Sequence, residues 1–206
     1  MNFIDLFENN FKVVLPEIYL ITALLFLLMY GVVFSTSLTY NLPIITRGVA
    51  WLSIQTLFIA LLLVLNNPID HLVIFHGTLV HDFFTSMVKV FLLIAAICCI
   101  SASFTYLKVE RLNAFEYFIL LLIAIVGMML IVSSYDLISM YLAIEMQSLS
   151  LYVLAAFKKN SAFSTEAGLK YFILGAFSSG LILFGSSMVY GFTGSTNFED
   201  ISRLCT

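Results

Sequence analysis

Six long apolar runs, separated by short polar segments, constrain the fold of this chain more than any other feature of its sequence. A run of about 20 apolar residues is long enough to cross the hydrocarbon core of a bilayer as a helix. Of the 206 residues, 62% are hydrophobic and 10% are charged, whereas soluble domains carry about 25% charged residues. The sequence therefore excludes a soluble globular fold and predicts an all-α membrane protein, a polytopic bundle of about six transmembrane helices.

The predicted spans form one transmembrane domain over residues 1–206 and cover approximately residues 13–33, 49–65, 85–106, 114–133, 137–157 and 165–192. A short amphipathic lead-in, residues 1–12, precedes the first span, and Pro16 suits the first turn of that helix. The segment 70–84 is predicted to be an interfacial loop. Ser164 is a good N-cap for the sixth span, and a soluble tail, TGSTNFEDISRLCT, follows that span.

The distribution of basic residues predicts the orientation, because Lys and Arg concentrate in the loops on the inner side of a membrane. The loops after the first, third and fifth spans carry five of them, Arg47, Lys108, Arg111, Lys158 and Lys159. The opposite flanks carry Lys12 and Arg203, so both termini are expected on the outer face. The N-terminal segment is acidic before its first lysine, unlike a signal peptide, so the first span is expected to remain in the mature protein.

No catalytic or metal-binding constellation is visible in the sequence. The sequence has no nucleophile–base arrangement and no phosphate-binding loop. The histidines are spaced by five residues, off a common helix face, and the cysteines lack metal-ligand spacing: His71, His76, His81, Cys98, Cys99 and Cys205. The net charge of −3 disfavours nucleic acid. We therefore expect no metal, no bound cofactor and no nucleic-acid partner.

The ionisable residues inside the spans are the candidate functional residues. Glu145 lies near the middle of the fifth span, where a carboxylate costs about 2.5–3.5 kcal/mol on insertion scales. It is expected about 18 Å from the inner end of its helix, and Lys170 about 8 Å from that end, at 1.5 Å per residue. The difference of about 10 Å is too large for direct contact, so water or a third residue must bridge the two groups.

Several of the charged residues in the spans also fit a purely structural role. Lys170 follows Glu166 by four residues, a favourable spacing for an ion pair at a helix surface. Glu17 beside Pro16 is compatible with interfacial capping of a helix N-terminus. Lys89, one turn inside its span, is compatible with either snorkelling to the interface or a functional role.

A physical mechanism follows from the placement of Glu145. Low-dielectric surroundings favour the neutral carboxyl group, and a nearby ammonium favours the carboxylate. Moving a cation toward or away from Glu145 would therefore release or load a proton. Polar side chains on the same helix are expected to hold water around the carboxylate, namely Gln147, Ser148, Ser150 and Tyr152.

Specific stretches resemble a known family over nearly the whole chain. YLAIEMQSLSLYVLAA at 141–156 and KKNSAFSTEAGLKYFILGAFSSGLILFGSSMVYGFTG at 158–194 are similar to chain 2 of proton-pumping NADH–ubiquinone oxidoreductase (respiratory complex I), especially to mitochondrially encoded forms of plant or protist type. LPEIYL at 15–20, YGVVFSTS at 30–37 and FEYFILLLIAIVGMML at 115–130 support the resemblance. It implies an antiporter-like membrane subunit that takes part in proton translocation coupled to ubiquinone reduction by NADH.

The resemblance also implies the surroundings and the site. Glu145 matches the family's glutamate on the fifth helix, and Lys170 matches its lysine early in the sixth. The chain would lie in the mitochondrial inner membrane among membrane lipids and other membrane-arm subunits. It would bind no cofactor and carry out no redox chemistry itself, because FMN, iron–sulfur clusters and ubiquinone belong to other subunits of the complex.

Two departures from the family pattern bear on these expectations. Bacterial relatives often carry proline where this chain has Ser150, which affects only the local helix geometry. The family has about fourteen spans built from inverted repeats, and the lysine that pairs with the glutamate lies on the seventh. Either a second chain supplies helices seven onward or this chain is a truncated product, and we expect the second chain. The alternatives are a non-pumping structural scaffold subunit of the same complex and an Mrp-type cation/proton antiporter subunit.

Overall fold

The computed structural model describes residues 3–35, 42–67, 71–109, 115–158 and 160–205. Seven helices and one small hairpin follow one another in the described part: α1 (Phe3–Ser35), α2 (Leu42–Leu65), β1 (Leu72–Ile74), η1 (Phe75–Gly77), β2 (Leu79–His81), α3 (Phe83–Val109), α4 (Glu116–Ser133), α5 (Leu137–Ala155), α6 (Ala162–Thr193) and α7 (Phe198–Cys205). Six of these helices, α1 to α6, are long and apolar enough to span a membrane. The predicted all-α membrane bundle is therefore confirmed.

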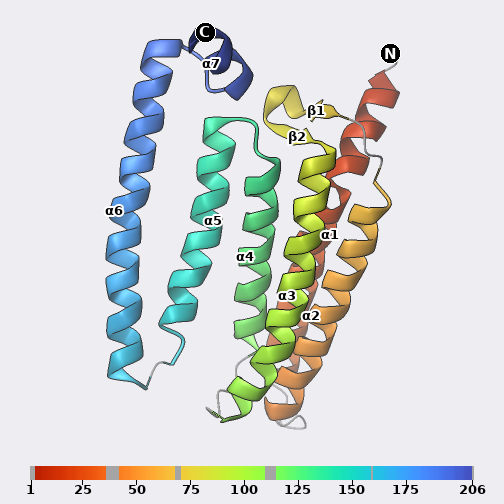
Figure 1. The fold of residues 1–206 in the computed structure, drawn as a ribbon. Helices are drawn as coiled ribbons and strands as arrows, with labels where there is room; N and C mark the ends of the chain where they lie inside the picture. The colour runs from red at the N-terminus through yellow and green to blue at the C-terminus, as the bar shows by residue number, and fades with distance from the viewer. Residues whose placement is uncertain (1–2, 36–41, 68–70, 110–114, 159, 206) are drawn as a thin grey trace.

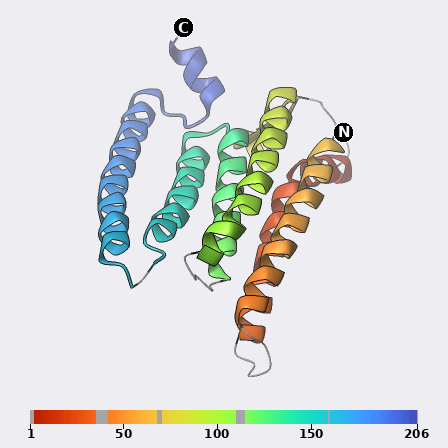
Figure 2. The ribbon, with the colours of Figure 1, turned by 60° about the horizontal axis from the view of Figure 1, so that its bottom comes forward.

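The core lies among the first four helices, and α4 is its most buried member. Half of the α4 span is buried, whereas Gly168 is the one buried residue of α6. Buried side chains from α1 to α4 form one continuous apolar cluster, which includes Leu20, Leu57, Leu93 and Phe118. Helix α5 packs on α4, and α6 packs on α5 at the edge of the bundle (Figures 1 and 2).

Several helix ends differ from the sequence prediction. Helix α1 begins at Phe3, so the expected lead-in is continuous with the span and Pro16 lies inside the helix rather than in its first turn. Helix α2 begins seven residues before the expected start, at Leu42. Helix α6 begins at Ala162 with Ser161 as N-cap residue, and the hydroxyl of Ser164 instead donates to the Ala155 carbonyl of α5 at 3.0 Å. Hydropathy does not register these extensions, because polar residues also continue a helix.

The described part of the segment 70–84 is not a loop as expected from the sequence but contains a small β-hairpin. Its position at the membrane interface stays a prediction. Strands β1 and β2 pair antiparallel, with Leu72 opposite His81. The turn between them requires positive φ at Phe75, His76 and Gly77, and a Cβ at Gly77 would lie 2.5 Å from the Asn197 side chain. His81, the last residue of β2, is buried within the protein.

The expected soluble tail contains α7, which is joined to the hairpin. Asn197, just before α7, donates from its side-chain nitrogen to the Gly77 carbonyl at 2.9 Å. The Thr78 carbonyl accepts hydrogen bonds from the Tyr135 amide and the Ser139 hydroxyl, at 2.9 and 3.1 Å. The hairpin therefore connects the end of α4, the start of α5 and the segment after α6. We call this side of the bundle the hairpin end.

Both chain termini lie at the hairpin end (Figure 1), as an even number of spans requires. The structure does not test which side of the membrane this end faces, so the outer-face orientation stays a prediction. Arg111 and Lys159, two of the residues on which it depends, lie outside the described residues, as does the side chain of Lys108.

Candidate functional site

Glu145 lies in the middle of α5 with one carboxylate oxygen enclosed by protein. The side chain is half-buried, and its Oε1 atom is buried but accepts no hydrogen bond from any described residue. Buried polar atoms are normally hydrogen-bonded, and an unsatisfied one costs about 1–3 kcal/mol or more for a charged group. Glu145 thus has the unsatisfied acceptor that a proton or a cationic partner would need.

Close helix packing fixes the position of this carboxylate. A Cβ at Gly127 of α4 would lie 2.9 Å from the backbone nitrogen of Gln147, so only glycine permits this approach of α4 to α5. On the other side, the ring of Tyr152 packs edge-on against Tyr171, and its hydroxyl fills the space that a Cβ at Gly175 would need. Helix α5 is therefore held between α4 and α6 on both sides of Glu145.

The packing register gives the depth relation between Glu145 and Lys170. Gly168 of α6 lies against Ala156 of α5, and Gly175 against Tyr152. In these antiparallel helices Lys170 is then level with about residue 154, nine residues from Glu145, or roughly 14 Å at 1.5 Å per residue. This separation agrees with the expectation that the two groups do not touch directly.

Lys170 instead pairs with Glu166 on the surface of α6. Its Nζ lies 2.5 Å from Glu166 Oε1, and the two side chains are 67% and 59% exposed. This is the alternative that the spacing of four residues left open, and no ion pair in the described part of the chain joins Lys170 to Glu145. A functional role for Lys170 therefore stays a prediction.

Three of the four polar side chains expected to hydrate Glu145 have other contacts in the structure. The Ser148 and Ser150 hydroxyls donate to backbone carbonyls of their own helix, those of Glu145 and Gln147, at 3.1 and 2.7 Å. Tyr152 packs against aromatic rings of α6. The two serine hydroxyls keep only their acceptor lone pairs for water, so their contribution is smaller than the sequence suggested.

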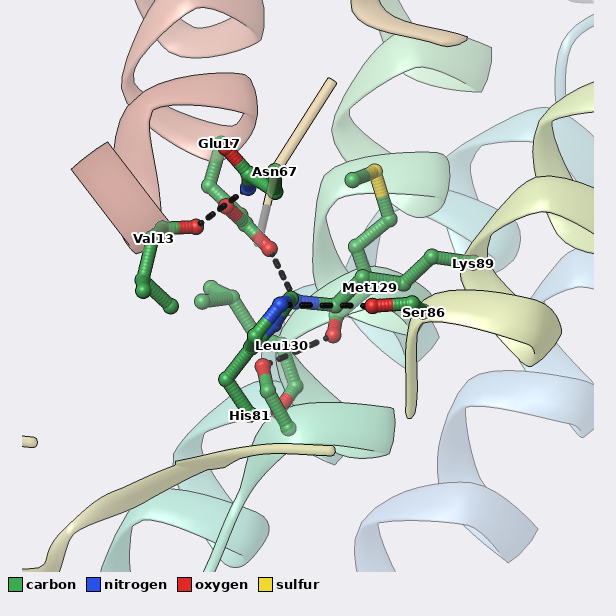
Figure 3. Close-up of polar contacts among 9 residues, drawn as sticks. Val13, Glu17, Asn67, His81, Ser86, Lys89, Met129 and Leu130 are labelled. Carbon is green, nitrogen blue, oxygen red and sulfur yellow. Dashed lines mark hydrogen bonds and ion pairs between the residues drawn. The ribbon is translucent and has the colours of Figure 1, made fainter. Parts of the chain in front are cut away.

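A second pair of membrane-embedded charges, Glu17 and Lys89, was not assembled from the sequence. Lys89 Nζ donates to Glu17 Oε1 at 2.5 Å, with the side chains only 4% and 3% exposed (Figure 3). The pair joins α1 to α3 across 72 residues. Interfacial capping by Glu17 and snorkelling by Lys89 are both wrong, because neither side chain reaches the surface of the bundle.

The fold positions this pair beneath the hairpin. Each residue lies about six positions inside its candidate span, or roughly 9 Å from the hairpin end. His81, the last residue of β2, is buried close by, and its Nε2 lies 3.3 Å from the Ser86 hydroxyl of α3. Asn67, after α2, donates to the Val13 carbonyl at 3.3 Å and fixes α1 just before its proline (Figure 3).

No cluster of three or more His, Cys, Asp or Glu side chains within the described ranges has a metal-binding arrangement. His71 and His81, at the two ends of the hairpin, have different neighbours, since His71 lies 3.4 Å from Asp82 at the surface. The chemistry that the described residues support is protonation and charge pairing inside the spans.

Six candidate spans, together with carboxylate and ammonium groups placed within them, define a class: a polytopic membrane protein with internal ionisable sites, as ion-translocating proteins have. Residues 134–206 match the family model described as NADH:quinone oxidoreductase/Mrp antiporter, TM. This match begins just before α5 and includes both Glu145 and Lys170.

Curated relatives match nearly the whole chain. NADH-ubiquinone oxidoreductase chain 2 of Marchantia polymorpha is 50% identical over 98% of this chain and 41% of its own length. NADH-quinone oxidoreductase subunit N of Paramagnetospirillum magneticum is 43% identical over 93% of this chain and 38% of its own length. A chain of respiratory complex I from Thermus thermophilus superposes with a TM-score of 0.71 at 27% identity, over 88% of this chain and 38% of that one.

The chain belongs to the family of NADH–ubiquinone oxidoreductase chain 2 and its bacterial counterpart, subunit N. It spans about two fifths of the length of the curated relatives it matches. The resemblance noted in the sequence is thereby confirmed at the level of family and fold.

Proposed function

We propose that this chain is a membrane-arm subunit of proton-pumping NADH–ubiquinone oxidoreductase and takes part in proton translocation coupled to ubiquinone reduction by NADH. The names of the relatives at 43–50% identity support the proposal. The single structural observation that carries it is the buried, unpartnered Oε1 of Glu145 in the middle of α5. The similarity to chain 2 of plants supports a place in the mitochondrial inner membrane.

Glu145 is the proposed proton carrier. One oxygen of this carboxyl group is enclosed by protein and has no described hydrogen-bond donor. In general, low-dielectric surroundings favour the neutral form of a carboxyl group, and the approach of a cation favours the carboxylate. An electrostatic change elsewhere in the complex that moves such a cation would load and release a proton at this residue. The chain supplies this step without redox chemistry, while FMN, iron–sulfur clusters and ubiquinone are held by other subunits.

The cationic group that acts on Glu145 is proposed to be the ammonium group of a lysine in a second chain. Lys170 is level with a position of α5 about nine residues from Glu145, and it forms an ion pair with Glu166. Lys170 therefore does not pair with Glu145 directly. On α6 the residues level with Glu145 are small, Ser178 to Gly180. A Cβ at Gly180 would have no described atom within 4 Å apart from the neighbouring part of α6 itself. Lys170 is proposed to exchange protons with water near the end of the bundle opposite to the hairpin end.

Copurification tests the assignment to this complex. An affinity tag on this chain should recover NADH:ubiquinone reductase activity together with the NADH-oxidising subunits, and a further polypeptide related to the remaining part of chain 2. Recovery without any NADH-oxidising subunit would refute the proposal and favour an Mrp-type antiporter subunit, which the description of the family model also names. An intact complex that pumps normally when Glu145 is neutralised would instead indicate a structural scaffold subunit.

A further inference from the structure

A small cavity lies beside the Glu17–Lys89 pair at the hairpin end. The cavity volume is about 10 Å³, and the polar residues that line it are Glu17, Lys89 and Ser133. Apolar side chains of α1 and of the hairpin form the rest of the wall. A volume of this size is close to the minimum that one buried water requires.

The polar atoms around the cavity have hydrogen-bonding capacity that the described residues leave unused. Glu17 Oε2 is buried and accepts no hydrogen bond in the described part of the chain. Lys89 Nζ carries three N–H donors, and Glu17 Oε1 accepts from it. The Ser133 hydroxyl donates to the Met129 carbonyl at 3.0 Å, so its oxygen retains lone pairs that can accept.

We propose that Glu17, Lys89 and Ser133 bind one water molecule, which completes the hydrogen bonding of the buried ion pair. The water oxygen accepts from Lys89 Nζ, and its two hydrogens are donated to Glu17 Oε2 and Ser133 Oγ. Three hydrogen bonds are typical of a buried protein water. The site takes a neutral ligand because the carboxylate and the ammonium already balance one another, so an additional ion would bring an uncompensated charge into the bundle.

The bound water gives the ion pair a third attachment point. Glu17 belongs to α1, Lys89 to α3 and Ser133 is the last residue of α4. The hydrated pair therefore ties three helices together directly under the hairpin, while Glu145 on α5 takes no part in it. The site is a positioning element for the hairpin end, and it does not depend on whether the complex pumps protons.

A map of the intact complex at a resolution that shows ordered water tests the proposal. We expect one isolated density peak within about 2.6–3.2 Å of Glu17 Oε2, Lys89 Nζ and Ser133 Oγ. Clear side-chain density for all three residues with no peak between them would overturn the proposal.

Three variants of the intact complex sharpen the test. Ser133→Val fills the cavity and removes the acceptor, so the peak should be lost. The matched control is Ser103→Val, which changes another buried serine that donates to a carbonyl of its own helix, that of Ile100 at 2.7 Å, and should leave the peak in place. If Ser133→Val prevents assembly, Ser133→Ala keeps the space but removes the acceptor, and an unchanged peak would contradict the role of Ser133. Normal proton pumping in these variants would leave the proposed function intact whatever the map shows.

Discussion

The buried Glu17–Lys89 pair makes the sharpest stability prediction, which concerns Lys89→Met. The substitution keeps the volume of the side chain but leaves a carboxyl group that is 3% exposed without its ammonium partner. Removing one member of a buried ion pair costs about 3–5 kcal/mol, which is a large share of the roughly 5–15 kcal/mol that stabilises a folded domain. We expect much less assembled complex, and earlier thermal inactivation of what does assemble.

The double variant Glu17→Leu with Lys89→Met shows whether the loss of stability comes from the unpaired charge or from the two substitutions acting independently. Replacing both members of a buried pair by apolar residues is often neutral or stabilising, so the double variant should recover most of the assembly that Lys89→Met loses. The assay is the amount of intact complex on a native gel and the temperature at which its NADH:ubiquinone reductase activity is lost. A double variant as impaired as the single one would refute the reasoning.

The surface pair Arg203–Glu199 provides the control for this experiment. Its side chains are 71% and 49% exposed, and exposed pairs contribute about 0–1 kcal/mol. Arg203→Met should therefore change assembly and thermal inactivation little. If it impaired the complex as strongly as Lys89→Met, burial would not be the cause of the effect.

Two further predictions concern α6 and the α4–α5 contact. Glu166→Gln breaks the exposed ion pair with Lys170, and a pair at this spacing contributes about 0.3–0.5 kcal/mol. The thermal inactivation temperature of the complex should therefore stay within error of wild type. A clear drop would show that Glu166 has another partner. Gly127→Ala places a Cβ 2.9 Å from the Gln147 backbone and should reduce the yield of intact complex. The control is Gly48→Ala, whose Cβ meets no atom of another helix within 4 Å and should leave the yield unchanged. Equal yields of the two variants would mean that α4 and α5 can separate without a loss of stability.

The spans could be predicted because hydropathy measures the property that the bilayer selects. All six expected helices are present, and their described ends differ from expectation by a few residues for most of them. The larger difference at α1 arises because a polar amphipathic segment joins the apolar span without a break, and Pro16 is tolerated inside the helix. The hairpin was missed because each strand has only three residues, too few for a clear alternation.

The candidate site could be predicted only where it depends on a single helix. Glu145 is visible as one charge in one apolar run, and the Glu166–Lys170 pair follows from a spacing of four. Glu17 and Lys89 each have a local explanation, and their contact exists only because α1 and α3 pack side by side at that point. The signal that was available is their opposite charge at similar depth from the same end of the bundle.

The measurement that tests the central claim most directly is the number of protons translocated per NADH oxidised by the complex carrying Glu145→Gln. The substitution keeps the shape of the side chain but removes its ability to carry a proton. With Glu199→Gln, which changes an exposed carboxylate of α7 outside the spans, as the control, we predict that assembly is retained in both variants and that proton translocation falls only in Glu145→Gln. A fully assembled Glu145→Gln complex with the wild-type number of protons per NADH would contradict the account.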